Sequence, residues 1–318
     1  MSDTQGLTAY LTEMRRIRAL EEKVAELRAG NDIVGSVHLC NGQEAIYVGS
    51  VATLDLTRDA VFPTYRGHGW AVACGVPMRA ILAELLGRET GISGGRGGSA
   101  YFTAPAYGFY GENSIVGAGA PIAAGAALAG TYDGSGRVAV AAFGDGAMNQ
   151  GAVHEAMNFA SIRRLPVIFV VENNSYSELT PIADMVRVDQ LFRRANAYGM
   201  TGAQVDGNDP VAVASAMHQA VARARRGLGP VLLEMMTQRL VGHYIGDVQH
   251  YRPEGELDEI AKSEPIVRIE ARLRGDGVPQ SALDQIRQTV ADEVERAAAE
   301  ALADRLEPTT SVLEHLYV

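Results

Sequence analysis

Cysteine is scarce in this sequence, and the two that occur form no pattern. Cys40 and Cys74 stand alone among 318 residues, and neither belongs to a group with metal-ligand spacing. We therefore expect no disulfide framework and no cysteine-based metal site, and so few cysteines are typical of a reducing compartment. The first 30 residues also lack the apolar segment of a signal peptide. These absences together predict a cytoplasmic protein.

Two further features are missing: a long hydrophobic run and an excess of positive charge. The most apolar stretch, residues 116–130, is rich in alanine and glycine and is shorter than the roughly 20 residues that span a bilayer. The formal net charge is −10, whereas nucleic-acid binding needs a basic face. We therefore expect neither a membrane protein nor a nucleic-acid-binding protein. A small anionic ligand stays compatible with this charge, since a few local cations suffice to bind it.

Glycine, in contrast, is abundant, at 35 of 318 residues against a usual share of about 7%. Several glycines gather in one short segment, at Gly91, Gly94, Gly95, Gly97 and Gly98. Such clustering fits a backbone that approaches a ligand closely, and it equally fits a set of tight turns. Composition alone leaves the two interpretations open.

Hydrophobic patterns predict one α/β domain over residues 1–318, with a mostly parallel sheet flanked by helices and with helical extensions at both ends. Short apolar runs with β-branched residues predict buried strands at 138–143, 166–171 and 230–235. A helix is expected to begin near Gly42, a polar loop to cover 61–69, and Ser281 to cap the last helix. Apolar residues at helical spacing predict the remaining helices at about 7–28, 78–86, 117–130, 150–163, 189–198, 210–226, 256–273 and 281–302.

Polar residues follow two of the predicted strands at their carboxyl ends: Asp145, between Gly144 and Gly146, and Asn174. Ligands of parallel α/β sheets bind beyond these ends, and the interval of 29 residues is about one strand-to-strand crossover. Magnesium prefers oxygen ligands and keeps phosphate oxygens and water in its shell. The glycines leave amide groups free at a helix start, which favours a diphosphate. Each motif alone is commonly a turn, but together they predict a magnesium-diphosphate site.

The stretch from Gly144 to Asn174 reads GDGAMNQGAVHEAMNFASIRRLPVIFVVENN. It resembles the thiamine diphosphate motif of the 2-oxo-acid dehydrogenase alpha subunits, a family that includes those of pyruvate, branched-chain 2-oxo-acid and acetoin dehydrogenases. The resemblance covers nearly the whole chain, because further blocks occur in the family's order: MRRIRALEEKV, HLCNGQEA, TYRGHG, GGRGGS, SIVGAGAPIAAGAALA, VDGND and VGHYIGDVQHYR. It implies the thiamine diphosphate-binding fold.

The resemblance implies a role for individual positions of the metal-diphosphate site. Asp145, the side chain of Asn174 and the carbonyl of Tyr176 would bind Mg²⁺. Gly144, Gly146 and Ala147 belong to the cofactor-binding motif, and the last two would donate backbone amides to the diphosphate.

Other positions match residues around the rest of the cofactor. Contacts with the diphosphate are implied for Tyr65, Arg66 and His243, and backbone contacts with the aminopyrimidine ring for Ser114 and Val116. His38, His68 and His243 match active-site histidines. A contact between Arg66 and a diphosphate is charge-assisted and physically reasonable. A single histidine is more often a hydrogen-bonded structural residue, so only the motif context favours a catalytic role for these three.

The resemblance also implies a partner. In this family the glutamate that activates thiamine diphosphate comes from a separate beta subunit, and Glu44, Glu112, Glu155 and Glu172 do not match that role. We therefore expect an α2β2 heterotetramer and an inactive isolated chain. The small side chains of 117–130 favour a subunit contact over an ordinary buried helix. The implied reaction is decarboxylation of an oxo acid, or cleavage of an acyloin such as acetoin, with acyl transfer to lipoamide on a lipoyl acyltransferase.

One departure from the family's pattern leaves the substrate open. After Ser99 this chain has Ala100 and Tyr101 where the family usually has Met-His. Because this histidine is missing, a second hypothesis stays open. The chain would then belong to a stand-alone two-subunit thiamine diphosphate enzyme that performs carboligation or a transketolase-like transfer without a lipoyl partner. A non-catalytic scaffold is harder to reconcile with an intact Asp145 and Asn174. A dinucleotide-binding enzyme is disfavoured, since no Gly-x-Gly-x-x-Gly follows the first strand.

Overall fold

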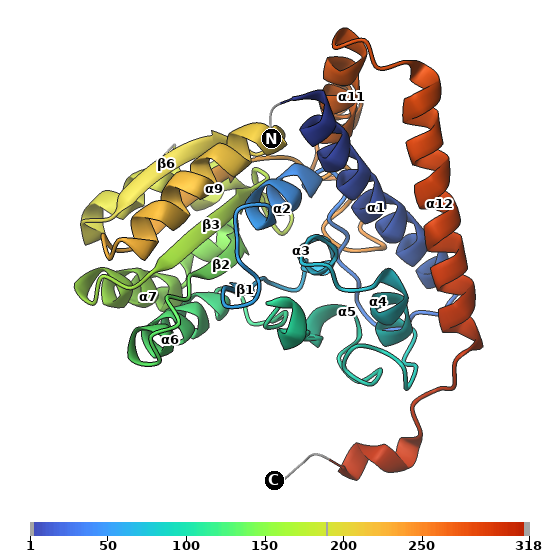
Figure 1. Ribbon diagram of the computed structural model, residues 1–318, viewed down its shortest axis with the longest axis horizontal. Coiled ribbons are helices and arrows are strands. Elements are labelled where there is room, and N and C mark those ends of the chain that lie inside the picture. Colours follow the sequence, from blue (N-terminus) through green and yellow to red (C-terminus); the bar gives the residue numbers. More distant parts are fainter. Residues whose placement is uncertain (1–2, 189, 315–318) are drawn as a thin grey trace.

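A five-stranded parallel sheet forms the centre of the protein in a computed structural model that describes residues 3–188 and 190–314 (Figure 1). Its strand order is β1-β2-β3-β7-β6, and every neighbouring pair is parallel. The strands are β1 (Ala60–Phe62), β2 (Ala139–Gly144), β3 (Val167–Asn173), β6 (Thr201–Asp206) and β7 (Val231–Met236). The predicted α/β class is therefore confirmed.

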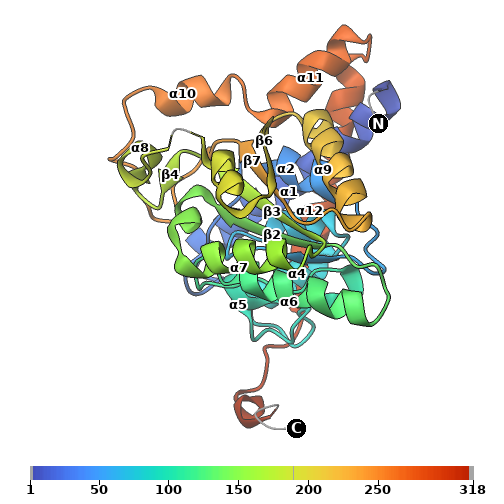
Figure 2. The ribbon, with the colours of Figure 1, turned by 90° about the vertical axis from the view of Figure 1, so that its left-hand side faces the viewer.

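Helices cover both faces of the sheet, as a buried parallel sheet requires (Figure 2). On one face lie α6 (Gly119–Tyr132) and α7 (Gly151–Ile162), and on the other α2 (Glu44–Val51) and α9 (Pro210–Arg225). Strands β2 and β3 are apolar along almost their whole length, because both faces are buried. The face of α6 toward the sheet consists of alanines, so this helix approaches β1 and β2 closely.

Two long helices form a further layer beyond α2 (Figure 1). Helix α1 (Thr4–Ala29) packs against α12 (Gln280–Ala303), and its predicted stripe of Leu11, Met14 and Ile17 is fully buried. The side chain of Asp3 caps α1 by accepting a hydrogen bond from the Gly6 amide at 2.9 Å. None of the described helices combines the length and the apolar composition that crossing a membrane requires.

The remaining elements are shorter and lie outside the central sheet. They are α3 (His68–Ala73), α4 (Met78–Leu85), α5 (Gly98–Tyr101), η1 (Pro105–Tyr107), η2 (Asp145–Asn149), β4 (Tyr176–Ser177), β5 (Thr180–Pro181), α8 (Ile182–Met185), η3 (Leu191–Tyr198), α10 (Glu256–Ala261), α11 (Pro265–Gly275) and η4 (Thr309–Leu313).

Two strands and two boundaries differ from the sequence-based expectation. Strand β1 overlaps the start of the expected polar loop and is too short for a periodic signal, while β6 is an edge strand whose residues, apart from Val205, are exposed or half-buried. The single helix expected over 256–273 is two, because Pro265 starts a new helix that the Glu264 carboxylate caps. Ser281 lies inside α12, whose N-cap is Pro279, so that prediction was wrong.

The segment expected as a helix over 189–198 is a 3₁₀ helix at Leu191–Tyr198, and Asp189 lies outside the described residues.

The glycine cluster wraps around a carboxylate of the chain itself. Glu84 is fully buried, and its oxygens accept hydrogen bonds from the amides of Ser93 (2.7 Å), Gly95 (2.8 Å) and Gly97 (2.6 Å). A β-carbon on Gly95 would collide with backbone atoms of Arg88. Close backbone approach therefore explains part of this cluster, and the anion that it approaches is Glu84.

Candidate active site

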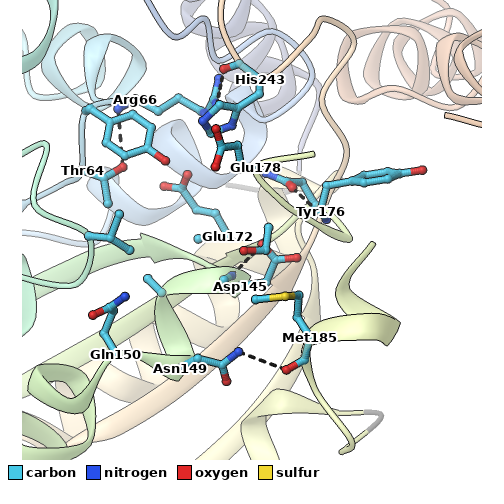
Figure 3. A pocket seen from close by; sticks show the side chains of 17 residues that line it. Thr64, Arg66, Asp145, Asn149, Gln150, Glu172, Tyr176, Glu178, Met185 and His243 are labelled. Atoms are coloured by element: carbon cyan, nitrogen blue, oxygen red, sulfur yellow. Dashed lines mark hydrogen bonds between the residues drawn. The ribbon is translucent and has the colours of Figure 1, made fainter. Parts of the chain in front are cut away.

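A cavity of about 250 Å³ opens at the carboxyl ends of β2 and β3, where the two sequence motifs meet (Figure 3). Residues from segments far apart in the chain line it: Thr64, Tyr65, Arg66, Val116, Gly144, Asp145, Gly146, Ala147, Asn149, Gln150, Glu172, Asn174, Tyr176, Ser177, Glu178, Met185 and His243. This edge of a parallel sheet is where ligands are expected to bind.

Asp145 supplies a buried carboxylate with an unused oxygen. It follows β2 directly and is 1% exposed. One oxygen, Oδ1, accepts a hydrogen bond from the Gly146 amide at 3.0 Å, while Oδ2 is buried without a partner. Burial raises the pKa of Asp145 to about 6. A buried carboxylate oxygen without a partner is costly, and a bound cation would remove that cost.

Asn174 and Tyr176 bring two neutral oxygens to the same edge. The Asn174 amide nitrogen Nδ2 donates to Gln43 Oε1 at 3.1 Å, which leaves Oδ1 on the side of the Tyr176 amide, 3.3 Å away. The Tyr176 ring points away from the cavity (Figure 3) and its hydroxyl donates to Glu256 at 2.7 Å, so only its main chain faces inward. One carboxylate with amide and carbonyl oxygens is the donor set of a hard cation such as Mg²⁺.

No group of three or more histidine, cysteine or acidic side chains in the described ranges is arranged to hold a metal. A metal bound at Asp145 would therefore take most of its other ligands from amide and carbonyl groups, water or an anionic ligand such as a diphosphate.

Arg66 joins the cavity to two loops. It lies between β1 and α3, and its guanidinium donates to the backbone carbonyls of Leu39 and His243, the latter at 2.8 Å. The segment around His243 also pairs with the segment around His38, since the Ile245 amide donates to the Val37 carbonyl at 2.9 Å. Arg66 therefore has a structural role in holding these loops as well as a charge facing the cavity.

The histidines beside Arg66 lie in a cationic environment. The ring centroids of His38 and His243 are 5.0 Å apart, and that of His38 is 4.4 Å from Tyr65. Burial, and next the positive charge of Arg66, lower the pKa of His38 to about 4 and that of His243 to about 3. Both imidazoles are neutral near pH 7, and an anion bound beside them would raise both pKa values.

Arg239 adds a second buried cation to this region. It is 1% exposed, and its Nη2 donates to the Glu178 carbonyl at 3.1 Å and to the Tyr251 hydroxyl at 3.4 Å. Its Nε and Nη1 are buried without partners. Burial, and next the charge of Arg66, lower the pKa of Arg239 to about 10. Two guanidinium groups that form no ion pair within the described part of the chain fit an anionic ligand.

One family model and three relatives bear on the family. The model of the "Dehydrogenase E1 component" family matches residues 12–309. The alpha subunit of acetoin:2,6-dichlorophenolindophenol oxidoreductase from Cupriavidus necator is 40% identical over 99% of this chain and 95% of its own length. The same subunit from Bacillus subtilis is 39% identical over 100% and 95%. The alpha subunit of the human pyruvate dehydrogenase E1 component (somatic form, mitochondrial) is 38% identical over 97% of this chain and 78% of its own length.

The chain belongs to the dehydrogenase E1 component family. The resemblance inferred from the sequence motifs is therefore confirmed, and with it a dehydrogenase of the thiamine diphosphate-dependent class.

Most of the predicted site residues of this E1 chain line one cavity. These are Tyr65, Arg66, Val116, Gly144, Asp145, Gly146, Ala147, Asn174, Tyr176 and His243. His38 is not among the lining residues, but its ring contacts the rings of two of them, Tyr65 and His243. Ser114 is half-buried just before Val116 and is not among the lining residues.

His68 lies apart from the cavity. Its ring is fully buried, with Nδ1 3.0 Å from Glu21 Oε2 and Nε2 3.0 Å from Ser99 Oγ. Burial alone would lower the pKa of His68, but the Glu21 carboxylate raises it to about 9. His68 therefore forms a buried ion pair that links α1 to the glycine-rich loop.

Sequence reasoning gave no role to Glu172, which lines the cavity next to the Asn174 motif. It is the penultimate residue of an otherwise apolar β3, and it accepts hydrogen bonds from Trp70 Nε1 at 2.7 Å and Gln43 Nε2 at 3.0 Å. Burial raises the pKa of Glu172 to about 7, against these bonds, which lower it. The signal was present in the sequence: a charged residue at a strand end, the same rule that identified Asp145.

Proposed function

We propose that this chain is the alpha subunit of a dehydrogenase E1 component that binds thiamine diphosphate through Mg²⁺ at the cavity beyond β2 and β3. The observation that carries the proposal is the buried Oδ2 of Asp145, which has no hydrogen-bond partner among the described residues and lies near Arg66 and Arg239, neither of which forms an ion pair within the described ranges. A cation beside the carboxylate and an anion beside the guanidinium groups satisfy both at once. Magnesium bridged to a diphosphate has these two charges.

The metal would be held by Asp145, by the Asn174 side chain and by the carbonyl of Tyr176. The diphosphate would lie against the amides of Gly146 and Ala147. Gly146 supports this arrangement, because a β-carbon there would collide with the Ser177 side chain, so the backbone passes very close to β4.

The other end of the diphosphate would contact Arg66, Tyr65 and His243. Arg66 binds as a fixed cation whose position its two carbonyl contacts set. Since the imidazoles of His38 and His243 are neutral at pH 7, they donate and accept hydrogen bonds there without adding positive charge. An anion at the cavity raises both pKa values toward the range where they exchange protons with substrate. His68 and Ser114 would act from outside the lining, the first through the Ser99 loop and the second through its backbone.

Bound thiamine diphosphate supplies a carbon nucleophile for a substrate carbonyl, which the protein orients and shields from water. The proposed substrate is a small 2-oxo acid or an acyloin, and the proposed acyl acceptor is lipoamide on a lipoyl acyltransferase. The chain supplies the cofactor's anchoring half, and we propose that a beta subunit supplies the activating glutamate in an α2β2 assembly. Two buried unpaired cysteines agree with a cytoplasmic location.

An exposed apolar surface supports the partner proposal. The cavity opens beside Val116, and the segment that follows it leads into α6, whose outer face carries apolar residues. Together with α7 these exposed side chains are Ile115 (71%), Val116 (38%), Ile122 (48%), Tyr132 (82%), Phe159 (39%) and Ile162 (70%). Apolar side chains exposed along two helices that begin beside a ligand site are typical of a subunit interface. The expected subunit contact at α6 remains part of this proposal.

The test is co-expression of the chain with a beta subunit gene, followed by two assays with pyruvate, branched 2-oxo acids and acetoin. The first follows reduction of 2,6-dichlorophenolindophenol, and the second reduction of lipoamide. We expect both activities to require magnesium, thiamine diphosphate and the beta subunit. Carboligation without reduction of either acceptor would instead support a stand-alone thiamine diphosphate enzyme, and no activity with any substrate would overturn the proposal.

A further inference from the structure

A chain of hydrogen bonds runs from Trp70 through Glu172 and Gln43 to Asn174. Trp70 Nε1 donates to Glu172 Oε1 at 2.7 Å, and Gln43 Nε2 donates to Glu172 Oε2 at 3.0 Å. Asn174 Nδ2 donates to Gln43 Oε1 at 3.1 Å. The four side chains come from α3, the end of β3, the N-terminus of α2 and the residue after β3, and all four are buried. Burial matters because water cannot substitute for a wrongly oriented amide.

The donors and acceptors of this hydrogen-bond chain follow one direction, because Trp70 and Glu172 have fixed hydrogen-bonding roles. The indole N–H of Trp70 only donates, and at pH 8, above its pKa of about 7, Glu172 is a carboxylate that only accepts. Gln43 therefore turns its NH₂ group to Glu172 and its carbonyl oxygen to Asn174.

Asn174 must in turn present its NH₂ group to Gln43. Its oxygen Oδ1 then lies on the opposite side, where the Tyr176 amide donates to it at 3.3 Å. The oxygen and nitrogen of an amide are nearly equal in size, so shape alone does not decide which of them faces a ligand. The hydrogen-bond chain makes that decision.

We propose that Gln43 and Glu172 are positioning residues that hold the Asn174 amide with its oxygen, and not its NH₂ group, toward the metal. The inference rests on the proposed function, since it assigns these residues to the magnesium site. A reversed amide would place two N–H groups against a cation and would remove one protein ligand. Residues that orient metal ligands in this way typically change metal affinity by about 10–100-fold when replaced.

The first test is Gln43→Met, which keeps the length and the neutral charge of the side chain but removes both hydrogen-bonding groups. The variant is prepared with the beta subunit, and magnesium is titrated by calorimetry at a fixed, saturating thiamine diphosphate concentration. We expect magnesium affinity to fall by about 10–100-fold. Wild-type affinity would overturn the inference. Gln288→Met is the matched control, because it makes the same change on the exposed side of α12, where the Gln288 amide donates to Asp292 at 2.8 Å outside the cavity lining. Affinity should stay close to wild type.

The second test uses two variants: the first reverses the direction of the hydrogen-bond chain, and the second restores it. In Glu172→Gln the new amide accepts from Trp70, so its NH₂ group faces Gln43, and both Gln43 and Asn174 must turn over. Magnesium affinity should fall by about 10–100-fold. Adding Gln43→Glu restores the direction, because a carboxylate at position 43 accepts from both neighbours, and the net charge equals that of the wild type. We expect the double variant to recover most of the lost affinity.

These outcomes separate the inference from the proposed function. A double variant no better than Glu172→Gln alone overturns the positioning role, and it also decides the question if Gln43→Met does not fold. Absence of magnesium-dependent cofactor binding in the wild type overturns the proposed function instead. Fluorescence of Trp70, the only tryptophan in the chain, gives a second readout without activity, since its indole donates to Glu172 and should respond to magnesium and cofactor in the wild type.

Discussion

Replacing Asp145 by asparagine should stabilise the cofactor-free protein while destroying its metal site. The carboxylate is buried with one oxygen unpaired, and its pKa rises from 3.8 to about 6 in the folded state. The unfolded state loses its proton first, so stability falls as pH rises through this range and the full cost is present above about pH 6. This pKa difference between the folded and unfolded states destabilises the folded protein by about 3 kcal/mol at pH 8 and by about half of that at pH 5.

Asparagine has nearly the same shape and carries no charge. Thermal unfolding of the two proteins, without magnesium or cofactor, should therefore give the variant the higher midpoint at pH 8, by several degrees, and a smaller advantage at pH 5. With magnesium and thiamine diphosphate at 100 times the dissociation constant, the wild type should gain about 2.7 kcal/mol and the variant nothing.

Asp59→Asn is the matched control. Asp59 is equally buried, but its oxygens accept bonds from Arg225 at 2.6 Å and from the amides of Asp55 and Val138, both at 2.9 Å. That variant should lose stability at both pH values and keep its cofactor response. An Asp145→Asn protein less stable than the wild type at pH 8 without ligands would refute the reasoning, because Asp145 would then be a satisfied structural residue.

Three further predictions follow from the site. Arg66→Ala should weaken thiamine diphosphate binding at least about 10-fold in calorimetry, since it removes a charge-assisted contact worth roughly 1.5–3 kcal/mol, and it should increase proteolysis near His243, whose carbonyl Arg66 binds; wild-type affinity would contradict this. Gly146→Ala should reduce cofactor affinity while far-ultraviolet circular dichroism stays unchanged, because its β-carbon collides with Ser177 beside the diphosphate position. For His68, whose pKa is raised to about 9, the stability that its ion pair contributes is complete below about pH 6.5 and is lost as pH rises through 9. The fall in unfolding midpoint between pH 7 and 10 should therefore be shallower in His68→Gln, and an unchanged slope would show that the histidine is neutral in the folded protein.

The sequence predicted the centre of the fold because its strands are buried on both faces. Strands β2, β3 and β7 consist mainly of apolar residues and are buried along almost their whole length. Strands β1 and β6 escaped prediction for opposite reasons. The first has three residues, too few for a pattern, and the second is an exposed edge strand of small and polar residues that only its pairing with β7 makes extended.

The candidate site likewise contains residues that the sequence predicted and residues that it did not. Asp145 and Asn174 were predictable because a polar residue after a buried strand faces the ligand edge of a parallel sheet. Arg239 and Gln43 were not, since their contribution depends on which distant side chains they meet. Gln43 is 131 residues from Asn174 along the chain, and no local pattern indicates that contact. The motif resemblance placed His68 in the active site, whereas its contacts with Glu21 and Ser99 place it in a buried ion pair behind the cavity.

The central claim is that Asp145 anchors a magnesium ion which in turn holds thiamine diphosphate. The most direct measurement is calorimetric titration of the assembled protein with thiamine diphosphate, with magnesium and with a chelator, for the wild type and for Asp145→Ala. The account predicts saturable binding of one cofactor per alpha chain that disappears with the chelator and in the variant. Binding of equal affinity without magnesium, or in Asp145→Ala, would contradict it.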